Sequence, residues 1–368
     1  MPECKGIGDA EMIVGTGLVY LSSVSSLLIW LVQFVIVVAV LIFVVLPSLL
    51  ALFPGIMVNM FFLNFRRIPL TDYTNCSANN VKSIGRAFYL RGQAGNIGVW
   101  HILPASLSSD YREKGVHPAD TEMEASLTLT KYPIVLYLHG NSFDRTIAHR
   151  VELYNLLSAL DCQVVTFDYR GYGDSDGDPS EPGLVNDSRT VYDYVKGHCG
   201  NNIIVVWGHS MGTGVATKLV MDLCSEDAPP YGLVLESPFN NLRDAVMNHV
   251  ISLPIRWMPE DMVQRIIVKP LRDVRLTMET DQRIKNVTCP ILILHAENDH
   301  VIPVILARRL RDVAVSASRD VQYIEFSSAR NYKHKFIYLA PELPDLIPLV
   351  FFSLRFFFSV VHQIFTET

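Results

Sequence analysis

The apolar residues near the start of this 368-residue chain form one long, uncharged run. No charged residue occurs within residues 12–65, and residues 27–46 are apolar except for Gln33. A helix over residues 27–46 would be roughly 30 Å long, which is about the thickness of the hydrocarbon core of a bilayer. The pattern predicts a transmembrane helix. We expect it to be retained as a signal anchor, because the run is longer and its leading segment more acidic than in a cleaved signal peptide.

The hydrophobic pattern divides the chain into four parts. They are a short N-terminal segment (1–26), the anchor (27–46), a juxtamembrane apolar segment with a linker (47–82) and a large domain (83–368). Residues 48–65 stay apolar but are interrupted by Pro54 and Gly55, so we expect an interfacial segment there rather than a second full span. A helical hairpin or re-entrant segment is the alternative.

Within the large domain, short apolar runs alternate with amphipathic runs. The strand-like runs are residues 84–90, 96–103, 134–138, 163–167, 203–207, 233–235, 291–294 and 321–326. The helix-like runs are residues 145–160, 184–196, 213–223 and 302–313. Residues 105–131 are mostly polar and predict a surface loop. Strands that alternate with helices predict an α/β fold, in which helices cover both faces of a mostly parallel sheet.

A long stretch, residues 238–290, separates the sixth strand-like run from the seventh. It contains two helix-like pieces, residues 242–251 and 261–268, among several prolines. In parallel sheets, functional groups gather at the carboxyl ends of the strands. An insertion at that edge predicts a helical cap, whose apolar residues either line a pocket or pack the cap onto the domain.

Composition and charge narrow the function classes. A net charge of −6 and the lack of a basic cluster argue against nucleic-acid binding. The six cysteines lack the paired spacing of a metal site, so we expect no metal. Orientation is undecided, because Arg66 and Arg67 after the anchor favour a cytoplasmic domain whereas N-glycosylation triplets at Asn75, Asn186 and Asn286 favour a lumenal one.

Residues 208–212 read Gly-His-Ser-Met-Gly and join a strand-like run to a helix-like run. This pattern is typical of a nucleophile elbow, a sharp turn that exposes a serine hydroxyl, here that of Ser210, above the sheet. Gly208 and Gly212 would leave room for the neighbouring backbone in such a turn. An ordinary tight turn with an idle serine is the alternative, and the presence of an acid, a base and oxyanion donors elsewhere decides between the two.

An acid and a base are found at positions that suit this serine. Asp299 lies just past the seventh strand-like run, and His334 follows the eighth, which gives the chain order Ser, Asp, His. Glu236, at the end of the sixth run, is the rival acid, and Asp299 could alternatively cap a helix. Loops at strand ends can aim the side chains of Asp299 and His334 at Ser210, and the choice of Asp299 over Glu236 rests on the family resemblance described below.

Two backbone amides are expected to form an oxyanion hole. One is the N–H of Met211, next after the serine, and the other is the N–H of Asn141, in the loop after the third strand-like run. Because these donors belong to the backbone, their role does not depend on the side chains.

The segment 168–175 is also rich in glycine and polar residues. We interpret it as a structural turn after the fourth strand-like run, in which Asp168 and Arg170 satisfy nearby backbone groups. It is given no catalytic role.

With these motifs in place, the chain resembles the α/β-hydrolase superfamily over residues 96–349 and, within it, the family of α/β-hydrolase domain-containing protein twelve. The segments that carry this resemblance are residues 96–101, 137–141, 150–154, 166–171, 212–217 and 332–338. The resemblance implies a membrane-anchored lipase that acts on lysophosphatidylserine and monoacylglycerol. It also implies that Ser210, Asp299 and His334 are the nucleophile, acid and base, that no cofactor is needed, and that the domain lies on the lumenal side of the endoplasmic reticulum membrane.

Two other functions stay open at this stage. The same triad would serve an S-acyl thioesterase that removes acyl groups from protein cysteines, and a hydrolase fold without activity could serve as a binding protein. The expected partners are a membrane lipid substrate and the bilayer. The tail, residues 349–365, is rich in phenylalanine but contains Arg355, so we expect a terminal helix on the sheet or an interfacial helix rather than a second span.

Overall fold

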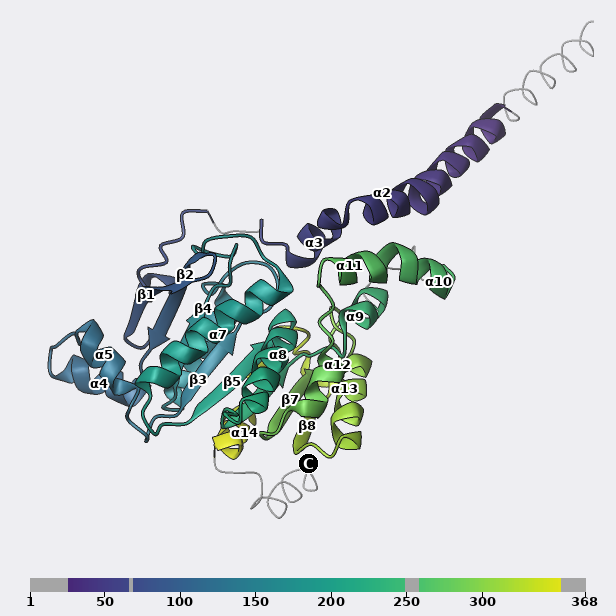
Figure 1. Cartoon of the computed structure of the whole chain (residues 1–368). Helices are drawn as coiled ribbons and strands as arrows, with labels where there is room; N and C mark the ends of the chain where they lie inside the picture. The colour runs from purple at the N-terminus through teal and green to yellow at the C-terminus, as the bar shows by residue number, and fades with distance from the viewer. Residues whose placement is uncertain (1–25, 66–68, 249–257, 352–368) are drawn as a thin grey trace, which may run out of the picture.

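The computed structural model describes residues 26–65, 69–248 and 258–351. Its centre is one sheet with the strand order β1-β2-β4-β3-β5-β6-β7-β8 (Figure 1). The strands are β1 (Gly85–Gly92), β2 (Gly95–Ile102), β3 (Ile134–Leu138), β4 (Gln163–Phe167), β5 (Ile204–His209), β6 (Gly232–Glu236), β7 (Ile291–Ala296) and β8 (Val321–Phe326). The pairings β1–β2 and β2–β4 are antiparallel and the others parallel, which confirms the predicted α/β fold.

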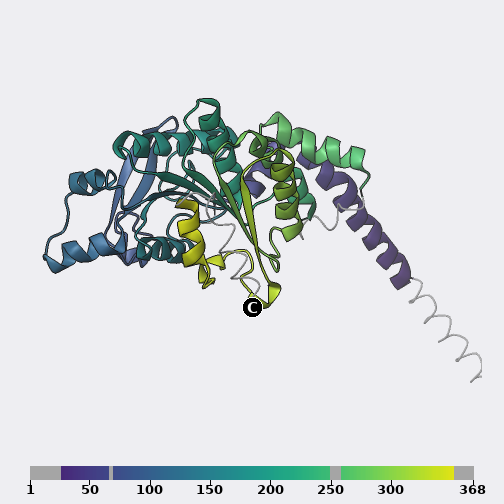
Figure 2. The same ribbon diagram turned by 90° about the horizontal axis from the view of Figure 1, so that it is seen from below.

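Every residue of strands β3 to β7 is buried, so both faces of the central sheet are covered, whereas the edge strands β1 and β8 are partly exposed. On β3, Ile134 and Leu136 belong to one apolar cluster, and Val135 and Tyr137 belong to the other. The first face carries α7 (Glu181–His198), α8 (Met211–Ser225) and α13 (Val304–Ser316); the second carries α6 (Ala148–Ala159) and α14 (Leu343–Phe351). Figure 2 shows the sheet between these layers. This arrangement buries the strands and leaves their carboxyl ends to form a site.

The insertion between β6 and β7 consists of short helices. They are α9 (Leu242–Asn248), α10 (Glu260–Val263), the π-helix η4 (Gln264–Val268), α11 (Lys269–Asp273), α12 (Thr280–Arg283) and the 3₁₀ turn η5 (Ile284–Asn286). Glu181 at the start of α7 joins this insertion to the sheet: its carboxylate accepts from the backbone N–H of Thr277 at 2.6 Å and of Met278 at 2.9 Å, and it pairs with Arg283. The exit of the insertion is therefore fixed to the body.

The N-terminal apolar run forms a helix from Ser26 to Leu49, and none of its most apolar window is buried in the protein. With 24 residues, it is long and apolar enough to cross a membrane by length and composition. The last residues of this helix belong to α2 (Leu46–Leu52), and α3 (Pro54–Phe62) follows. These two helices contact η4 and α11, so the apolar helix leaves the body beside the insertion (Figure 1).

One expectation from the sequence is wrong and another lies mostly outside the described residues. The polar segment 105–131 is not a loop, because it forms α4 (Ala105–Glu113) and α5 (Asp120–Ser126). Its few apolar residues explain this difference, since Met123 is buried with Ile84 and Leu103 in a small separate cluster. Beyond residue 351, the phenylalanine-rich tail lies outside the described part of the chain.

Candidate active site

Ser210 lies at the sharp turn between β5 and α8. Its backbone has φ 53° and ψ −120°, a conformation that residues other than glycine seldom adopt. The turn is held from both sides: the Ser210 N–H donates to the Glu236 carbonyl at 2.9 Å, and the Ser210 carbonyl accepts from the Thr213 hydroxyl at 2.6 Å. These bonds maintain a strained conformation that projects the serine side chain from the carboxyl edge of the sheet.

The two elbow glycines lie where backbone segments approach closely. A Cβ atom on Gly212 would lie 2.2 Å from the carbonyl oxygen of Leu138, and one on Gly208 would lie 2.5 Å from the carbonyl oxygen of Gly212. Both distances are far below van der Waals contact, so no larger residue fits at either position without moving β3 or α8.

Asp299, His334 and Ser210 form one hydrogen-bonded line. The Nε2 atom of His334 lies 2.9 Å from the Ser210 hydroxyl, and its Nδ1 atom lies 2.7 Å from Oδ2 of Asp299. All three residues are buried, with exposed fractions of 8% for Ser210, 6% for Asp299 and 5% for His334. In this geometry His334 can take a proton from the serine while the carboxylate fixes the orientation of the ring.

The carboxylate of Asp299 is stabilised in its charged form. Burial alone would raise its pKa, but His334 and His295 and their hydrogen bonds outweigh burial and hold the pKa of Asp299 well below its usual range. Its other oxygen, Oδ1, accepts from the backbone N–H groups of Val301 at 2.8 Å and Ile302 at 2.9 Å. Asp299 therefore stays ionised at neutral pH.

His209, inside the elbow, supports the histidine of this line. Its Nε2 atom donates to the backbone carbonyl of His334 at 2.9 Å, and the two rings lie 5.1 Å apart. Burial, followed by the charge of His334, holds the pKa of His209 well below its usual range, so the ring is neutral. This contact could not be predicted from the sequence, because the two residues are 125 positions apart.

Glu236, the rival acid, points elsewhere. One of its carboxylate oxygens accepts from the indole N–H of Trp207 at 2.9 Å, and burial raises the pKa of Glu236 to about 7. No contact with His334 is recorded among the described residues. Asp299 is thus the acid that the geometry favours.

This raised pKa predicts a pH-dependent stability. A carboxyl group whose pKa is higher in the folded state than in the unfolded state stabilises the fold fully at low pH, and the contribution is lost between about 4.5 and 7 as the pH rises. Glu236→Gln keeps an oxygen acceptor for Trp207 without a charge. The variant should match wild type near pH 4 and exceed its stability at pH 8, by on the order of 1–3 kcal/mol. Thermal unfolding at both pH values checks this prediction. A stability difference between the variant and wild type that is the same at pH 4 and pH 8 would contradict it.

The loop after β3 contains Asn141, the second predicted oxyanion donor, and is held by Arg150. The buried guanidinium of Arg150 donates to the carbonyl oxygens of Gly140 at 2.8 Å, Asn141 at 3.3 Å and Ser142 at 2.9 Å. Among the described residues, no acceptor is recorded for the Asn141 N–H. The N–H of Met211 has no acceptor within its helix, because it is the first residue of α8. Arg150 is a positioning residue that sequence reasoning missed, although it lies in one of the segments that resemble the family.

The turn 168–175 is only partly as expected. Asp168 accepts from the Arg145 backbone N–H at 2.7 Å, which agrees with a structural turn, but Arg170 binds the carboxylate of Asp187 at 2.7 Å rather than backbone groups. The carboxylate is the stronger partner for a buried guanidinium, because the bond joins opposite charges. The turn also places the Tyr172 hydroxyl 3.2 Å from the side-chain oxygen of Asn141.

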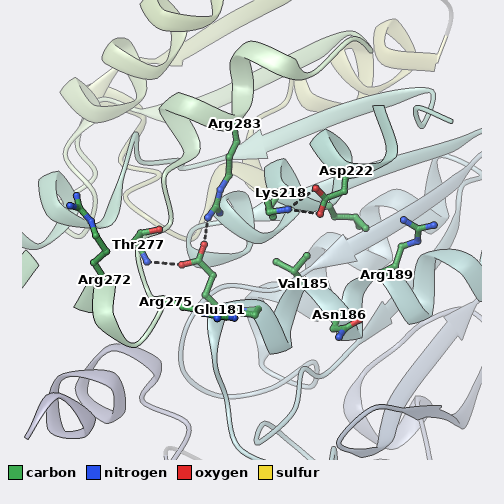
Figure 3. Close-up of a pocket in the computed structure, with 12 residues that line it drawn as sticks. Glu181, Val185, Asn186, Arg189, Lys218, Asp222, Arg272, Arg275, Thr277 and Arg283 are labelled. Carbon is green, nitrogen blue, oxygen red and sulfur yellow. Dashed lines mark hydrogen bonds and ion pairs between the residues drawn. The ribbon is translucent and has the colours of Figure 1, made fainter. Parts of the chain in front are cut away.

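A cavity of about 490 Å³ lies away from Ser210, between α7, α8 and the segment that follows α11 (Figure 3). Four of its seven charged residues pair with one another, Glu181 with Arg283 and Lys218 with Asp222 at 2.6 Å, whereas Arg189 pairs with Asp193 and Glu226 outside the lining. None of the three residues of the hydrogen-bonded line borders it. We therefore assign this cavity to the junction between cap and body rather than to the substrate.

The three glycosylation triplets differ in accessibility. The asparagines Asn75, Asn186 and Asn286 are all exposed, but Ser188, the last residue of the Asn186 triplet, is fully buried within α7. Among the described residues, no group of histidine, cysteine, aspartate or glutamate side chains is arranged to hold a metal ion.

Comparison with known proteins places this geometry in context. The model of the α/β-hydrolase family matches residues 135–343. Lysophosphatidylserine lipase ABHD12 of Danio rerio is 39% identical over 311 residues, which cover 83% of this chain and 80% of that protein. The Rattus norvegicus protein of the same name is 40% identical over 310 residues, which cover 83% and 76%. Among solved structures, an α/β hydrolase from Vibrio vulnificus has a TM-score of 0.60 at 20% identity, covering 80% of this chain and 92% of that one, and so shares the fold.

Proposed function

This chain belongs to the α/β-hydrolase family and, within it, to the family of the ABHD12 proteins, and on that premise we propose that it cleaves the acyl ester of single-chain membrane lipids. That it is a serine ester hydrolase follows from the family. The observation that carries the finer proposal is the buried line from Asp299 through His334 to Ser210. It supplies a nucleophile, a base and an orienting carboxylate in contact.

The proposed reaction has two halves. His334 takes the proton of Ser210 while the serine oxygen attacks the ester carbonyl, and the N–H groups of Asn141 and Met211 stabilise the oxyanion. The tetrahedral intermediate collapses to an acyl-enzyme, and His334 returns the proton to the departing alcohol. Water, deprotonated by His334, then attacks the acyl group in the same way, which releases the fatty acid and restores the serine.

A lipid substrate is supported by the way the site is held. The exposed apolar helix runs into α2 and is followed by α3, and both α2 and α3 contact the cap, so an enzyme anchored by this helix works beside the bilayer that contains its substrate. Two lysines, Lys333 and Lys335, flank His334 in the chain. Both lysines are exposed. These charges favour an anionic head group.

The test compares three substrates. Membranes that carry the full chain are offered lysophosphatidylserine, monoacylglycerol and an S-acylated peptide side by side, and fatty-acid release is measured. We expect release from both lipids, faster from lysophosphatidylserine, with a preference that shrinks as salt is added. Release from the peptide alone would replace the lipase with a thioesterase, and release from none would favour an inactive binding protein.

We further propose that the domain lies in the lumen of the endoplasmic reticulum. Asn75 and Asn286 are exposed acceptors that an oligosaccharyltransferase could reach. A gel shift that is reversed by endoglycosidase and lost in the Asn75→Gln/Asn286→Gln protein would support this orientation. An unglycosylated chain whose domain is digested by protease added to sealed microsomes would contradict it.

A further inference from the structure

The last turn of α3 lies against the oxyanion loop. The carbonyl oxygen of Phe61 accepts from the side-chain amide of Asn141, and the carbonyl oxygen of Phe62 accepts from the Tyr172 hydroxyl at 2.5 Å. The last four carbonyls of a helix have no partner within it, so they need partners elsewhere when buried. Phe62 is fully buried, and here the partners come from the catalytic domain. The end of α3 is thus bonded to the site rather than merely resting on it.

Tyr172 joins α3 to both proposed oxyanion residues. Its hydroxyl lies 2.5 Å from the Phe62 carbonyl, 3.2 Å from Oδ1 of Asn141 and 4.0 Å from the sulfur of Met211. Burial raises the pKa of Tyr172 well above its usual range, so the hydroxyl keeps its proton and donates it. The Phe62 carbonyl is the main acceptor, because its contact with the hydroxyl is the shorter one.

The oxyanion loop is therefore held on two sides. Arg150 binds the carbonyls of residues 140–142 from within the domain, which turns the Asn141 N–H away from the guanidinium. The opposite side is held by Tyr172 and α3 through the side chain of Asn141, whose Oδ1 also accepts from the Ser142 N–H at 2.7 Å. Loss of the second support would let the loop rotate, and an oxyanion donor that is displaced by a fraction of an ångström loses much of its effect.

We propose that α3 contributes to catalysis by supporting the oxyanion hole. Tyr172 and Asn141 couple this juxtamembrane helix to the oxyanion hole, so the segment that leads from the membrane also sets the rate of ester cleavage. Tyr172 is a positioning residue, since it acts through the loop. The inference rests on the proposed function, because it requires that the Asn141 N–H binds the oxyanion. It gives the anchor segment a role beyond tethering.

The experiment uses the full chain and a soluble short-chain ester, so that access to the membrane does not enter. Tyr172→Phe removes only the hydroxyl, and we expect kcat to fall roughly 10-fold with KM within about 2-fold of wild type. The rate at which a fluorophosphonate labels Ser210 should fall in parallel, because phosphonylation needs the same oxyanion donors. Tyr154→Phe is the matched control, since the Tyr154 hydroxyl is equally buried but contacts Thr166 at 3.2 Å.

A second pair of variants tests α3 itself. Asn59 is exposed in the interior of α3, so Asn59→Pro breaks the helix whereas Asn59→Ala does not. Asn59→Pro should reproduce the fall in kcat, and adding Tyr172→Phe to it should cost little more, because both changes remove one support. The coupling is wrong if Tyr172→Phe and Asn59→Pro retain the kcat of their controls. Should Tyr172→Phe fail to fold, the Asn59 pair decides alone.

The Ser210→Ala variant separates a failure of the coupling from a failure of the proposed function. If Ser210→Ala is inactive while Tyr172→Phe behaves as Tyr154→Phe, the hydrolase stands and only the coupling falls. If Ser210→Ala hydrolyses the ester at the wild-type rate, the mechanism itself falls, and the coupling with it.

Discussion

Replacing Ser210 with alanine is expected to lower fatty-acid release by at least roughly 10⁴-fold while leaving the protein folded. The serine oxygen is the atom that attacks the ester, and no other hydroxyl lies within hydrogen-bond distance of Nε2 of His334 among the described residues. The remaining activity would come from the oxyanion donors and binding alone. Initial rates with lysophosphatidylserine, measured on protein whose thermal unfolding matches wild type, check this prediction.

Ser237→Ala supplies the matched control for this experiment. Ser237 is likewise a buried serine with a positive φ, 51°, at the end of a neighbouring strand, and its hydroxyl has no hydrogen-bond partner among the described residues. Its loss should leave the rate within about 2-fold of wild type, because the hydroxyl is not joined to His334. A Ser210→Ala protein that keeps a tenth of the wild-type rate would mean that another group is the nucleophile.

Asp299→Asn is expected to lower kcat by about 10⁴-fold with little change in KM. The amide can still accept from Val301 and Ile302 through its oxygen, so the loop keeps its shape. It carries no charge, however, to stabilise the imidazolium that forms on His334, and its NH₂ group would favour the wrong tautomer. The measurement is the steady-state rate on lipid and on a soluble ester, both of which should fall together.

The Asp299→Asn variant also has a predicted pH signature. Because the pKa of Asp299 is held below its usual range, the carboxylate stabilises the fold at pH values above its unfolded pKa near 3.8, and this contribution is lost as the pH falls. The variant should therefore be less stable than wild type at pH 7, with a difference that shrinks toward pH 3. Glu236→Gln is the control, since its stability should change in the opposite direction and its activity should persist.

The elbow could be predicted because it depends on local sequence, and its partners could be predicted from the topology of the sheet. A buried strand, a glycine-flanked serine and a helix are adjacent in the chain, and the topology of a parallel sheet brings Asp299 and His334 to the same edge. The α4 and α5 helices could not be predicted as readily. Their apolar residues are few, and Met123 is buried only because Ile84 and Leu103 lie beside it in space.

The contacts that hold the oxyanion loop could not be predicted from the sequence either. Tyr172 and Phe62 are 110 residues apart, and their contact joins a turn to the backbone of a helix, which leaves no periodicity in either segment. Arg150 lies on α6 among residues that read as an ordinary helix, although it donates to several carbonyls of the oxyanion loop. Residues that act through backbone groups of other segments are recognised only once the fold brings them together.

Trapping the intermediate shows directly whether Ser210 carries the acyl group during hydrolysis. Wild-type protein is mixed with lysophosphatidylserine that bears an isotope-labelled acyl chain, quenched in acid within one turnover, and digested with trypsin. We expect the labelled acyl mass on Ser210, in the peptide of residues 197–218, and its absence from Ser210→Ala. An acyl label on Cys199 or on any other residue, or rapid turnover with no labelled protein under the same quench, would contradict it.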